Sequence, residues 1–321
     1  MKGKGSTIEI GLNAAVTSTV ENNPVILRIK GDSYTKSDSL PYGKFDPLEH
    51  RTMEAGLRQL VEAQTGLRPG YVEQLYTFGD RGRHKTTDNQ EPHVVSVGYL
   101  ALARQQQDPD SKIAGWESWY NYLPWEDWRK GRPQLLDEVI ISGLLEWATA
   151  SSENTPAVRG LDPVSRVKIA FGLDGANWED ELVLDRYELM YAAGMVAEAQ
   201  ADGRIGNIKS SVALGTQMLH DHRRILATAV TRLRAKLKYR PVVFELMPDS
   251  FTLTDLQQTV ECIFGRSIHK QNFRRLVENA ELVEPTGASE HSTGGRPAAL
   301  FRFRSDILKE RPVSGLKVGR S

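Results

Sequence analysis

The sequence predicts an α+β protein of two domains, the second of which is a winged helix-turn-helix. The chain has 321 residues, 40% of them hydrophobic, which is enough to build two cores. Its N-terminal part contains segments typical of β-strands, and its C-terminal part contains two short helical patterns followed by a hairpin pattern. We expect the first domain to span residues 1–215 and the second to span residues 216–321.

Four segments of the N-terminal region are predicted to be strands. Residues 8–19, 25–30, 71–78 and 94–103 are each rich in β-branched or aromatic side chains. Between the second and third, residues 43–67 show one helix face, traced by Met53, Leu57, Leu60, Val61 and Gln64. The first domain should therefore combine a sheet with at least this helix.

Two short helices around a glycine turn are predicted near the C-terminus. Thr252 is suited to cap the first helix, with Asp255 three residues on, and Gly265 ends it. The buried stripe of this helix comprises Leu256, Val260, Ile263 and Phe264. The second helix is expected to begin near Ser267 and to turn inward Ile268, Phe273 and Leu276.

The exposed side of the second helix is rich in hydrogen-bond donors. Its candidate DNA-binding residues are His269, Lys270, Gln271, Asn272, Arg274 and Arg275. Side chains of these types suit phosphates and base edges in the major groove. This helix is therefore the candidate recognition helix.

A hairpin pattern follows the recognition helix. Residues 282–284 and 299–304 are typical of two strands joined by a polar, glycine-rich loop. Arg296 lies at the predicted tip, and Arg302 and Arg304 alternate with two phenylalanines, so one strand face can pack while the other meets phosphate. These three arginines complete the predicted DNA-binding residues of a wing. The alternative is a small α+β module whose arginines are only solvated.

The zero net charge of the chain hides an uneven distribution. From Thr216 to Ser321 there are 18 Lys and Arg against 11 Asp and Glu, a surplus of seven positive charges, and the remainder carries the opposite surplus. Because DNA phosphates reward local positive charge, this division favours a basic DNA-binding module joined to an acidic domain with another task.

Composition excludes several other classes. The single cysteine, Cys262, lies on the apolar stripe of a predicted helix and is expected to be a buried structural thiol. No apolar run approaches the roughly 20 residues of a membrane span, and the N-terminus lacks the apolar core of a signal peptide. We expect a cytoplasmic protein without a membrane partner.

Residues 43–67 resemble a Nudix box, whose pattern is G-x5-E-x7-R-E-U-x-E-E-x-G-U with U aliphatic. Gly43 and Glu49 match its opening, and Gly66 and Leu67 match its close, although the spacing after Glu49 is two residues too long. The resemblance implies an α/β/α sandwich for the first domain.

The acidic positions of the box do not match. Counting back from its close, Gln59 and Leu60 stand where the box has Arg-Glu, and Ala63 and Gln64 stand where it has the Glu pair. Sliding the alignment by one residue recovers Arg58 and Glu62 but leaves Gln59 and Ala63 at metal positions. Nudix hydrolysis needs these carboxylates to hold Mg²⁺, so we expect no catalytic residues and no required cofactor. Glu49, Glu54 and Glu62 remain weak candidates for a metal, and a role for Mg²⁺ is left open.

Two stretches together resemble the NrtR family, Nudix-related bacterial transcription factors that control genes of NAD biosynthesis or salvage. One is HDHRRILATAVTRLRAKLKYRPVVFELMPDSFTLTDLQQTVECIFGRSIHKQNFRRLVENAELVEP with the later GGRPAALFRFR, and the other contains QLYTFGDRGR and VVSVGYLAL. The resemblance implies a homodimeric repressor that senses ADP-ribose or a related NAD metabolite. One departure is a stretch of about 90 residues, 126–215, where typical members have a short connection.

This additional stretch is predicted to be helical. Residues 135–149 and 182–201 have apolar side chains at helical spacing, with a loop of Pro, Gly and Asp between them. Its tryptophans and those just before it are expected to fill the core rather than to stack an adenine.

A linker helix over residues 219–239 should then join the two domains. A metal site at His220 and His222 is disfavoured, because positions i and i+2 of a helix point apart.

The candidate ligand site lies on a charged loop after the third strand. Asp80, Arg81 and Arg83 follow Phe78, and Arg28 ends another strand near the expected cleft. Arginine pairs suit a diphosphate because the guanidinium is planar and bidentate. Tyr99 and Glu73 are weaker candidates. The alternative is an ordinary charged loop without a ligand.

Two functions remain open. The first is a ligand-responsive repressor that binds a pseudo-palindromic double-stranded DNA operator as a dimer and has no enzymatic activity. The second is an ADP-ribose pyrophosphatase with an accessory DNA-binding domain. The missing carboxylates favour the first. An RNA-binding module is disfavoured, since the sequence has neither an aromatic RNP face nor a GXXG clamp.

Overall fold

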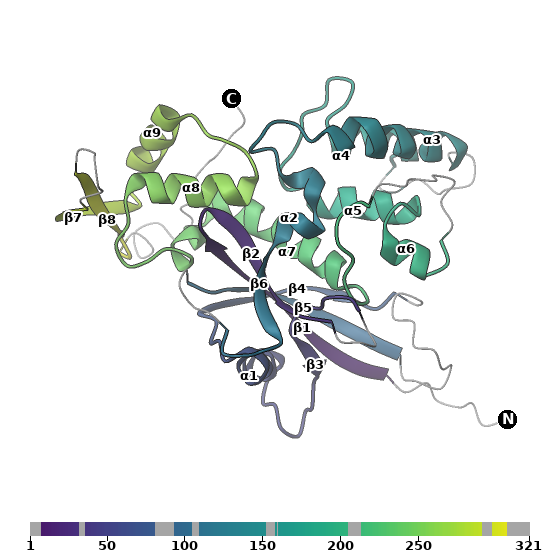
Figure 1. Cartoon of the computed structure of the whole chain (residues 1–321), viewed down its shortest axis with the longest axis horizontal. Helices are drawn as coiled ribbons and strands as arrows, with labels where there is room; N and C mark the ends of the chain where they lie inside the picture. Colours follow the sequence, from purple (N-terminus) through teal and green to yellow (C-terminus); the bar gives the residue numbers. More distant parts are fainter. Residues whose placement is uncertain are drawn as a thin grey trace.

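The computed structural model of the chain describes residues 8–31, 36–80, 93–104, 109–151, 158, 160–204, 213–290 and 297–306. Its first domain is built on a mixed sheet of strand order β4-β5-β1-β2-β6, with β3 paired to β1 (Figure 1). The strands are β1 Ile8–Val20, β2 Asn23–Ile29, β3 Tyr42–Lys44, β4 Tyr71–Phe78, β5 His93–Leu102 and β6 Ala114–Ser118. The four strands predicted from the sequence are confirmed to within two residues at each end.

The central pair β1 and β5 is parallel, from Ile8 opposite His93 to Thr17 opposite Leu102, and the other pairs are antiparallel. Along β1 the side chains alternate between two cores. Leu12 and Val16 pack against the helix α1, Met53–Thr65, whereas Ala15 faces the helix α7, His222–Tyr239. The sheet therefore lies between two helical layers, and the predicted α/β/α sandwich is confirmed.

Helix α7 is not a linker, and this corrects the expectation for residues 219–239. Its apolar residues Ile225, Leu226, Val230 and Leu233 are fully buried in the core that contains Leu100 of β5, and α7 also packs along α5. The apolar stripe was expected to belong to a helix that only connects the two domains, but it covers one face of the sheet. We therefore place α7 in the first domain and move the boundary from residue 215 to the end of this helix.

Residues 119–201 form a helical group above the sheet (Figure 1). It comprises α2 Trp119–Tyr122, η1 Pro124–Glu126, the π-helical η2 Leu136–Ile141, α3 Ser142–Ser151, α4 Pro163–Phe171, α5 Val183–Ala192 and α6 Ala197–Ala201. The first predicted helix is confirmed, with a π-helical start. Trp119 and Trp125 are fully buried, and Trp128 and Trp147 pack against the same core.

Two expectations for this group were wrong. The loop predicted between the two helices contains α4, because Asp162 caps it, Pro163 occupies its first turn and Gly172 ends it at φ 62°, so residues that suggested a loop are helix ends. The second predicted helix is two helices, α5 and α6, separated at Gly194, which has φ 70°.

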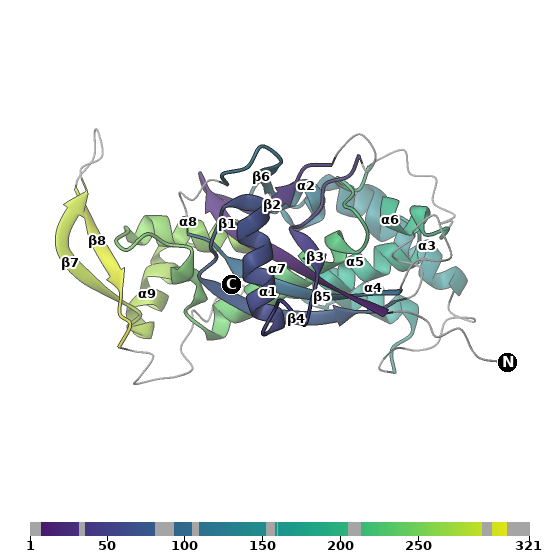
Figure 2. The same ribbon diagram turned by 90° about the horizontal axis from the view of Figure 1, so that it is seen from below.

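The second domain follows α7 and extends away from the sheet (Figure 2). Its elements are η3 Val242–Glu245, α8 Leu253–Phe264, α9 Lys270–Ala280, β7 Val283–Glu290 and β8 Ala298–Phe303. The predicted cap is confirmed, since Thr252 and Asp255 form a reciprocal capping box. The thiol of Cys262 is buried and free, and burial raises its pKa to about 12, as expected of a structural cysteine. No helix within the described ranges is long and apolar enough to span a membrane.

Candidate DNA interface and ligand site

The recognition helix is oriented by the short segment that connects it to α8. Gly265 ends α8 in the left-handed conformation, with φ 71°. Glu261 then accepts a hydrogen bond from the backbone N of Ile268 at 2.7 Å, and Gln257 donates to the Ile268 carbonyl at 2.8 Å. These contacts keep the segment non-helical, so α9 begins at Lys270 with His269 as its N-cap, not near Ser267 as predicted.

The donors predicted on the recognition helix lie together on its exposed side. Phe273 and Val277 are buried against α8 and the core, and Leu276 is half-buried beside them. The exposed residues are His269, Lys270, Gln271, Asn272, Arg274 and Arg275. Since positions three and four apart share a helix face, Lys270, Arg274 and their neighbours Gln271 and Arg275 form one continuous donor surface. This surface can donate to phosphates and base edges.

The hairpin β7–β8 presents one of the three predicted arginines to solvent. Arg302 is 63% exposed and donates to Glu284 across the hairpin at 2.7 Å. Phe303 packs inward, stacked on Phe244 at 4.4 Å between ring centroids, as the alternation predicted. Arg304 lies just beyond β8 and is half-buried, and Arg296 lies outside the described residues.

Most of the charge surplus of residues 216–321 comes from helix α7 and not from the DNA surface, which corrects the charge argument. Residues 216–240 hold seven of the 18 Lys and Arg and only one acid, so from residue 241 onward there are 11 bases and ten acids. On α7 these bases pair with the first domain: Arg232 and Lys236 contact Glu73 at 3.0 and 2.8 Å, and Lys238 contacts Glu181. The charge surplus of residues 216–321 thus reflects ion pairs inside the first domain, while α9 carries a local basic surface.

Two of the predicted ligand residues meet at one arginine of α7. The Arg224 guanidinium lies 5.1 Å from the centroid of the Phe78 ring and bonds the Asp80 carboxylate. The same guanidinium pairs with Glu188 of α5. Arg81 and Arg83 lie outside the described residues. Arg224 was missed because its part in the site depends on α7 lying against the sheet.

The other predicted ligand residues lie elsewhere. Arg28 on β2 pairs with Asp38 and Glu117, each at 3.4 Å, and two strands separate it from Phe78 on β4, roughly 14 Å at sheet spacing. Tyr99 belongs to the core under α1, the opposite face from Phe78. The structure therefore does not bring Arg28 and Tyr99 together with Phe78 and Asp80.

The acidic residues of the Nudix-like segment are mostly engaged in ion pairs. Glu54 bonds Arg58 at 2.9 Å, Glu62 bonds Arg68 at 2.6 Å, and Glu49 is exposed before the helix. Within the part of the chain that the structure describes, no three potential metal-binding side chains lie together. His222 is buried, and its Nδ1 accepts a hydrogen bond from the backbone N of Leu40 at 3.0 Å.

A cavity of about 570 Å³ lies at the junction of the two domains. Its walls include Tyr71, Arg104, Lys236, Arg240, Phe244 and Phe303. Of the predicted ligand residues that the structure describes, none lines it.

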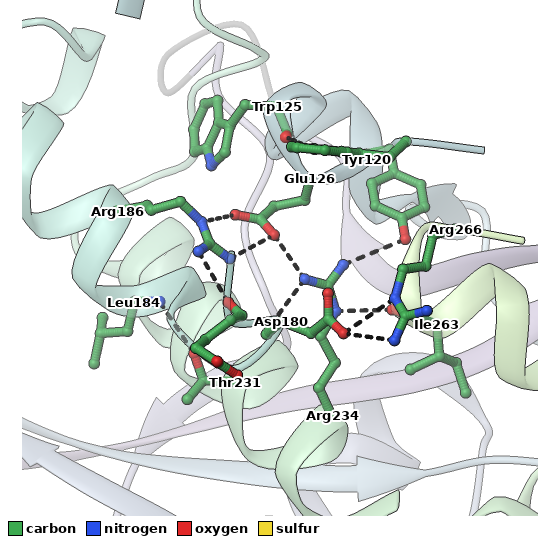
Figure 3. A network of polar contacts seen from close by, with 12 residues as sticks. Tyr120, Trp125, Glu126, Asp180, Leu184, Arg186, Thr231, Arg234, Ile263 and Arg266 are labelled. Carbon is green, nitrogen blue, oxygen red and sulfur yellow. Dashed lines mark hydrogen bonds and ion pairs between the residues drawn. The ribbon is translucent and has the colours of Figure 1, made fainter. Parts of the chain in front are cut away.

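A buried polar network joins the helical group to the turn of the second domain (Figure 3). Glu126 bonds Arg186 at 2.6 Å and Arg234 at 2.6 Å, and all three side chains are almost completely buried. Burial alone would raise the pKa of Glu126, but the two guanidiniums outweigh it and hold this pKa below its ordinary value. Asp180 pairs with Arg266, in the turn before α9, at 3.1 Å. Sequence analysis missed this network, because its members are far apart in the chain.

Comparison with known proteins supports the assignment of the winged domain. Residues 243–303 match the family model of the NrtR DNA-binding winged helix domain. The "ADPR responsive transcriptional repressor NtrR" of Acinetobacter baylyi is 41% identical over 91 residues, which are 28% of this chain. That match spans 36% of the relative, about a third of its length.

Two solved structures share the fold over nearly the whole chain. Shewanella oneidensis NrtR complexed with a 27mer DNA has a TM-score of 0.57 and 18% identity, covering 96% of this chain and 97% of that chain. A MutT/nudix family protein from Enterococcus faecalis has a TM-score of 0.52 and 16% identity, covering 95% and 89%. The predicted combination of a Nudix-like domain with a C-terminal winged helix is confirmed, as is the resemblance to NrtR.

Proposed function

We propose that this protein is a transcriptional repressor that binds a double-stranded DNA operator and responds to ADP-ribose or a related NAD metabolite. The observation that carries the proposal is the exposed donor surface of α9, which lies within the segment that matches the NrtR winged helix domain. A helix of this kind fits the major groove, where side chains such as Arg274 and Gln271 can reach base edges. The wing with Arg302 would contact the adjoining phosphate backbone of the DNA.

The proposed effector follows from the relative and from the site chemistry. The Acinetobacter relative is described as ADPR responsive. In this chain the Asp80 carboxylate pairs with Arg224 beside the buried Phe78 ring, and the sequence continues with Arg81 and Arg83, whose guanidinium groups suit a nucleotide diphosphate. We place the effector there and expect the regulated genes to belong to NAD biosynthesis or salvage.

We propose that the protein binds DNA as a two-fold dimer on a pseudo-palindromic operator. A single winged module buries too little surface for tight specific binding, and a two-fold dimer places two recognition helices one or two helical turns apart.

The Nudix-like domain is proposed to bind its ligand without hydrolysing it. The positions that would need carboxylates hold Gln59 or Leu60, Ala63 and Gln64, and Glu62 is paired with Arg68. Purified protein incubated with ADP-ribose and Mg²⁺ or Mn²⁺ should release no AMP at enzyme-like rates. Turnover near 1–10³ s⁻¹, the usual range for enzymes, would instead favour an ADP-ribose pyrophosphatase.

A gel-shift assay tests the proposed function directly. The probe is the DNA upstream of the gene for this chain, and the shift is measured alone, with ADP-ribose and with NAD. We expect a saturable shift that unlabelled probe competes away and unrelated DNA does not, and that one of the two nucleotides alters. A shift of equal strength on any DNA would contradict an operator-binding role.

A further inference from the structure

The last turn of α8 is capped by groups from the first domain. Two of its carbonyls accept hydrogen bonds from outside the helix: Cys262 from the hydroxyl of Tyr120 at 2.7 Å, and Ile263 from Nε of Arg234 at 2.9 Å. The carbonyl of the C-cap residue Gly265 accepts a third, from the backbone N of Trp128 at 2.6 Å. A helix leaves its last four carbonyls without partners of its own. Here the partners are supplied by α2, α7 and the chain after η1. We call Tyr120, Trp128 and Arg234 the α8 socket.

The socket is buried and electrostatically matched to the helix end. Tyr120 is 5% exposed and Arg234 is 0% exposed, so water does not replace either donor. The C-terminal end of a helix carries partial negative charge, which favours the Arg234 cation at this position. Gly265 fits against the socket without room for a side chain, since a Cβ there would lie 2.3 Å from the Glu126 carbonyl oxygen.

The donors of the socket are themselves held in place. Glu126 fixes the guanidinium of Arg234, and Arg186 of α5 binds the same carboxylate with two nitrogens, at 2.6 and 3.0 Å (Figure 3). The Asp180 side chain holds Arg266, which lies one residue beyond the glycine that ends α8. The backbone carbonyl of Asp180 also accepts a hydrogen bond from Arg234 at 3.1 Å. The two carboxylates that hold these arginines, Glu126 and Asp180, therefore both belong to the helical group of residues 119–201.

The position of the recognition helix depends on this contact. Only five residues, 265–269, separate the end of α8 from the start of α9, and the side chains of Gln257 and Glu261 hold that segment to α8. Once the last turn of α8 is fixed to the first domain, the direction of α9 is fixed with it. A small rotation of α8 in the socket would move the donor surface of α9 relative to the groove.

We propose that the α8 socket positions the recognition helix. One function of the helical group of residues 119–201 is then to hold the socket residues in place. The socket residues are positioning residues, because none of them belongs to the exposed DNA surface. This inference rests on the proposed DNA-binding function. It predicts that weakening the socket lowers discrimination between DNA sequences without lowering the general attraction to DNA, since the phosphate-binding charges stay in place.

Two tyrosines of α2 provide a matched pair for the test. Tyr120 and Tyr122 are both buried, and each donates its hydroxyl hydrogen bond at short range, to Cys262 at 2.7 Å and to Asp38 at 2.8 Å respectively. Of the two hydroxyls, it is that of Tyr120 that bonds α8. Replacing either with phenylalanine removes one hydroxyl and keeps the ring, so both variants should fold.

The experiment compares Tyr120→Phe, Tyr122→Phe and the wild type on two DNA probes. One is a duplex selected from a random-sequence library with the wild-type protein, and the other is an unselected random duplex of equal length. For Tyr120→Phe we expect the affinity for the selected duplex to fall about tenfold, with the affinity for the random duplex and the salt slope unchanged. For Tyr122→Phe we expect wild-type discrimination, with a loss of thermal stability similar to that of Tyr120→Phe.

A second variant tests the same socket from the helical group. Asp180→Asn should lower discrimination in the same way, and Asp180→Glu should restore most of it by keeping the charge for Arg266. If both tyrosine variants, or neither, lose discrimination while the wild type discriminates, this inference is overturned and the DNA-binding proposal stands. If the wild type itself prefers no duplex, the DNA-binding proposal fails, and the inference fails with it.

Discussion

At the residue scale, Glu126 is the group on which the buried network depends most. Its pKa is lowered, because the guanidiniums of Arg186 and Arg234 outweigh the effect of burial. A carboxyl group with a lowered pKa stabilises the fold above its unfolded pKa, and this contribution is lost as the pH falls through the folded value. We expect the free energy of unfolding in urea to be highest near neutral pH and to decline below about pH 4.5, approximately the ordinary pKa of a glutamate.

Replacing this carboxylate tests the prediction. Glu126→Gln leaves two buried guanidiniums without a counter-charge and should cost about 3–5 kcal/mol at pH 7, and less at acid pH. Asp137→Asn is the control, because Asp137 is bonded by Arg132 at 2.8 Å but its side chain is 58% exposed. An exposed pair of this kind contributes below about 1 kcal/mol. Equal losses in the two variants would contradict the importance of the buried network.

Arg274 and Arg275 are the residues with which the DNA interface can be tested most simply. Both are exposed on the donor surface of α9, so substitution should leave the stability of the fold nearly unchanged. We expect Arg274→Ala and Arg275→Ala each to weaken operator binding, by about 1–3 kcal/mol where the arginine reads a base. Fluorescence anisotropy at several salt concentrations separates a base contact from a phosphate contact. Unchanged affinity in the double variant would remove α9 from the interface.

At the element scale, the junction of α8 with the first domain can be probed with a pair of glycines. Gly265 at φ 71° packs against Glu126 and Tyr120, whereas a Cβ added to Gly287, at φ 82° in β7, would meet no described atom within 4 Å. Both substitutions to alanine should cost about 1–2 kcal/mol for the left-handed backbone. Gly265→Ala should cost about 1–3 kcal/mol more, since the backbone carbonyl of Glu126 must shift. Urea unfolding measures both, and equal losses would mean that the junction yields easily.

At the scale of the whole molecule, the ligand candidate and the recognition helix are connected through α5 and α7. Arg224 of α7 binds Asp80, and it also binds Glu188 of α5. Arg186, two residues from Glu188 on α5, and Arg234, ten residues from Arg224 on α7, both bind Glu126. A ligand that moves the Asp80 segment would therefore act on helices that also hold the α8 socket. Such a connection offers a route for coupling between the two sites, and its size is a matter for measurement.

Reciprocity gives the corresponding prediction. If ADP-ribose changes DNA affinity by some factor, operator DNA must change ADP-ribose affinity by the same factor, with a typical coupling of about 1–3 kcal/mol. Calorimetric titration of ADP-ribose into free and DNA-bound protein should show this difference. Arg224→Ala should reduce it, whereas Arg132→Ala, at an exposed pair, should not. Equal ADP-ribose affinities in the two titrations would mean that another molecule is the signal.

The sequence by itself determined the local elements and the chemistry of the recognition helix. The four main strands, α1, the capping box at Thr252 and the glycine end of α8 follow from patterns within a few residues, where propensity, capping and periodicity act. The donors of α9 were predicted for the same reason, because the helical period of 3.6 residues places Phe273 and Val277 on one face and Arg274 and Arg275 on another. Even the ends of α4 were present in the sequence, as Asp162, Pro163 and Gly172, but they were interpreted as a loop.

Only the tertiary structure decided which distant residues meet. Glu126 and Arg234 are 108 positions apart in the chain, so no local pattern pairs them. The same holds for α7, whose amphipathic stripe is compatible with a linker or with a sheet layer until the fold assigns it a partner. Its basic residues suggested a DNA surface and are in fact paired with acids of the first domain, because charge composition records how many charges there are and not where they lie.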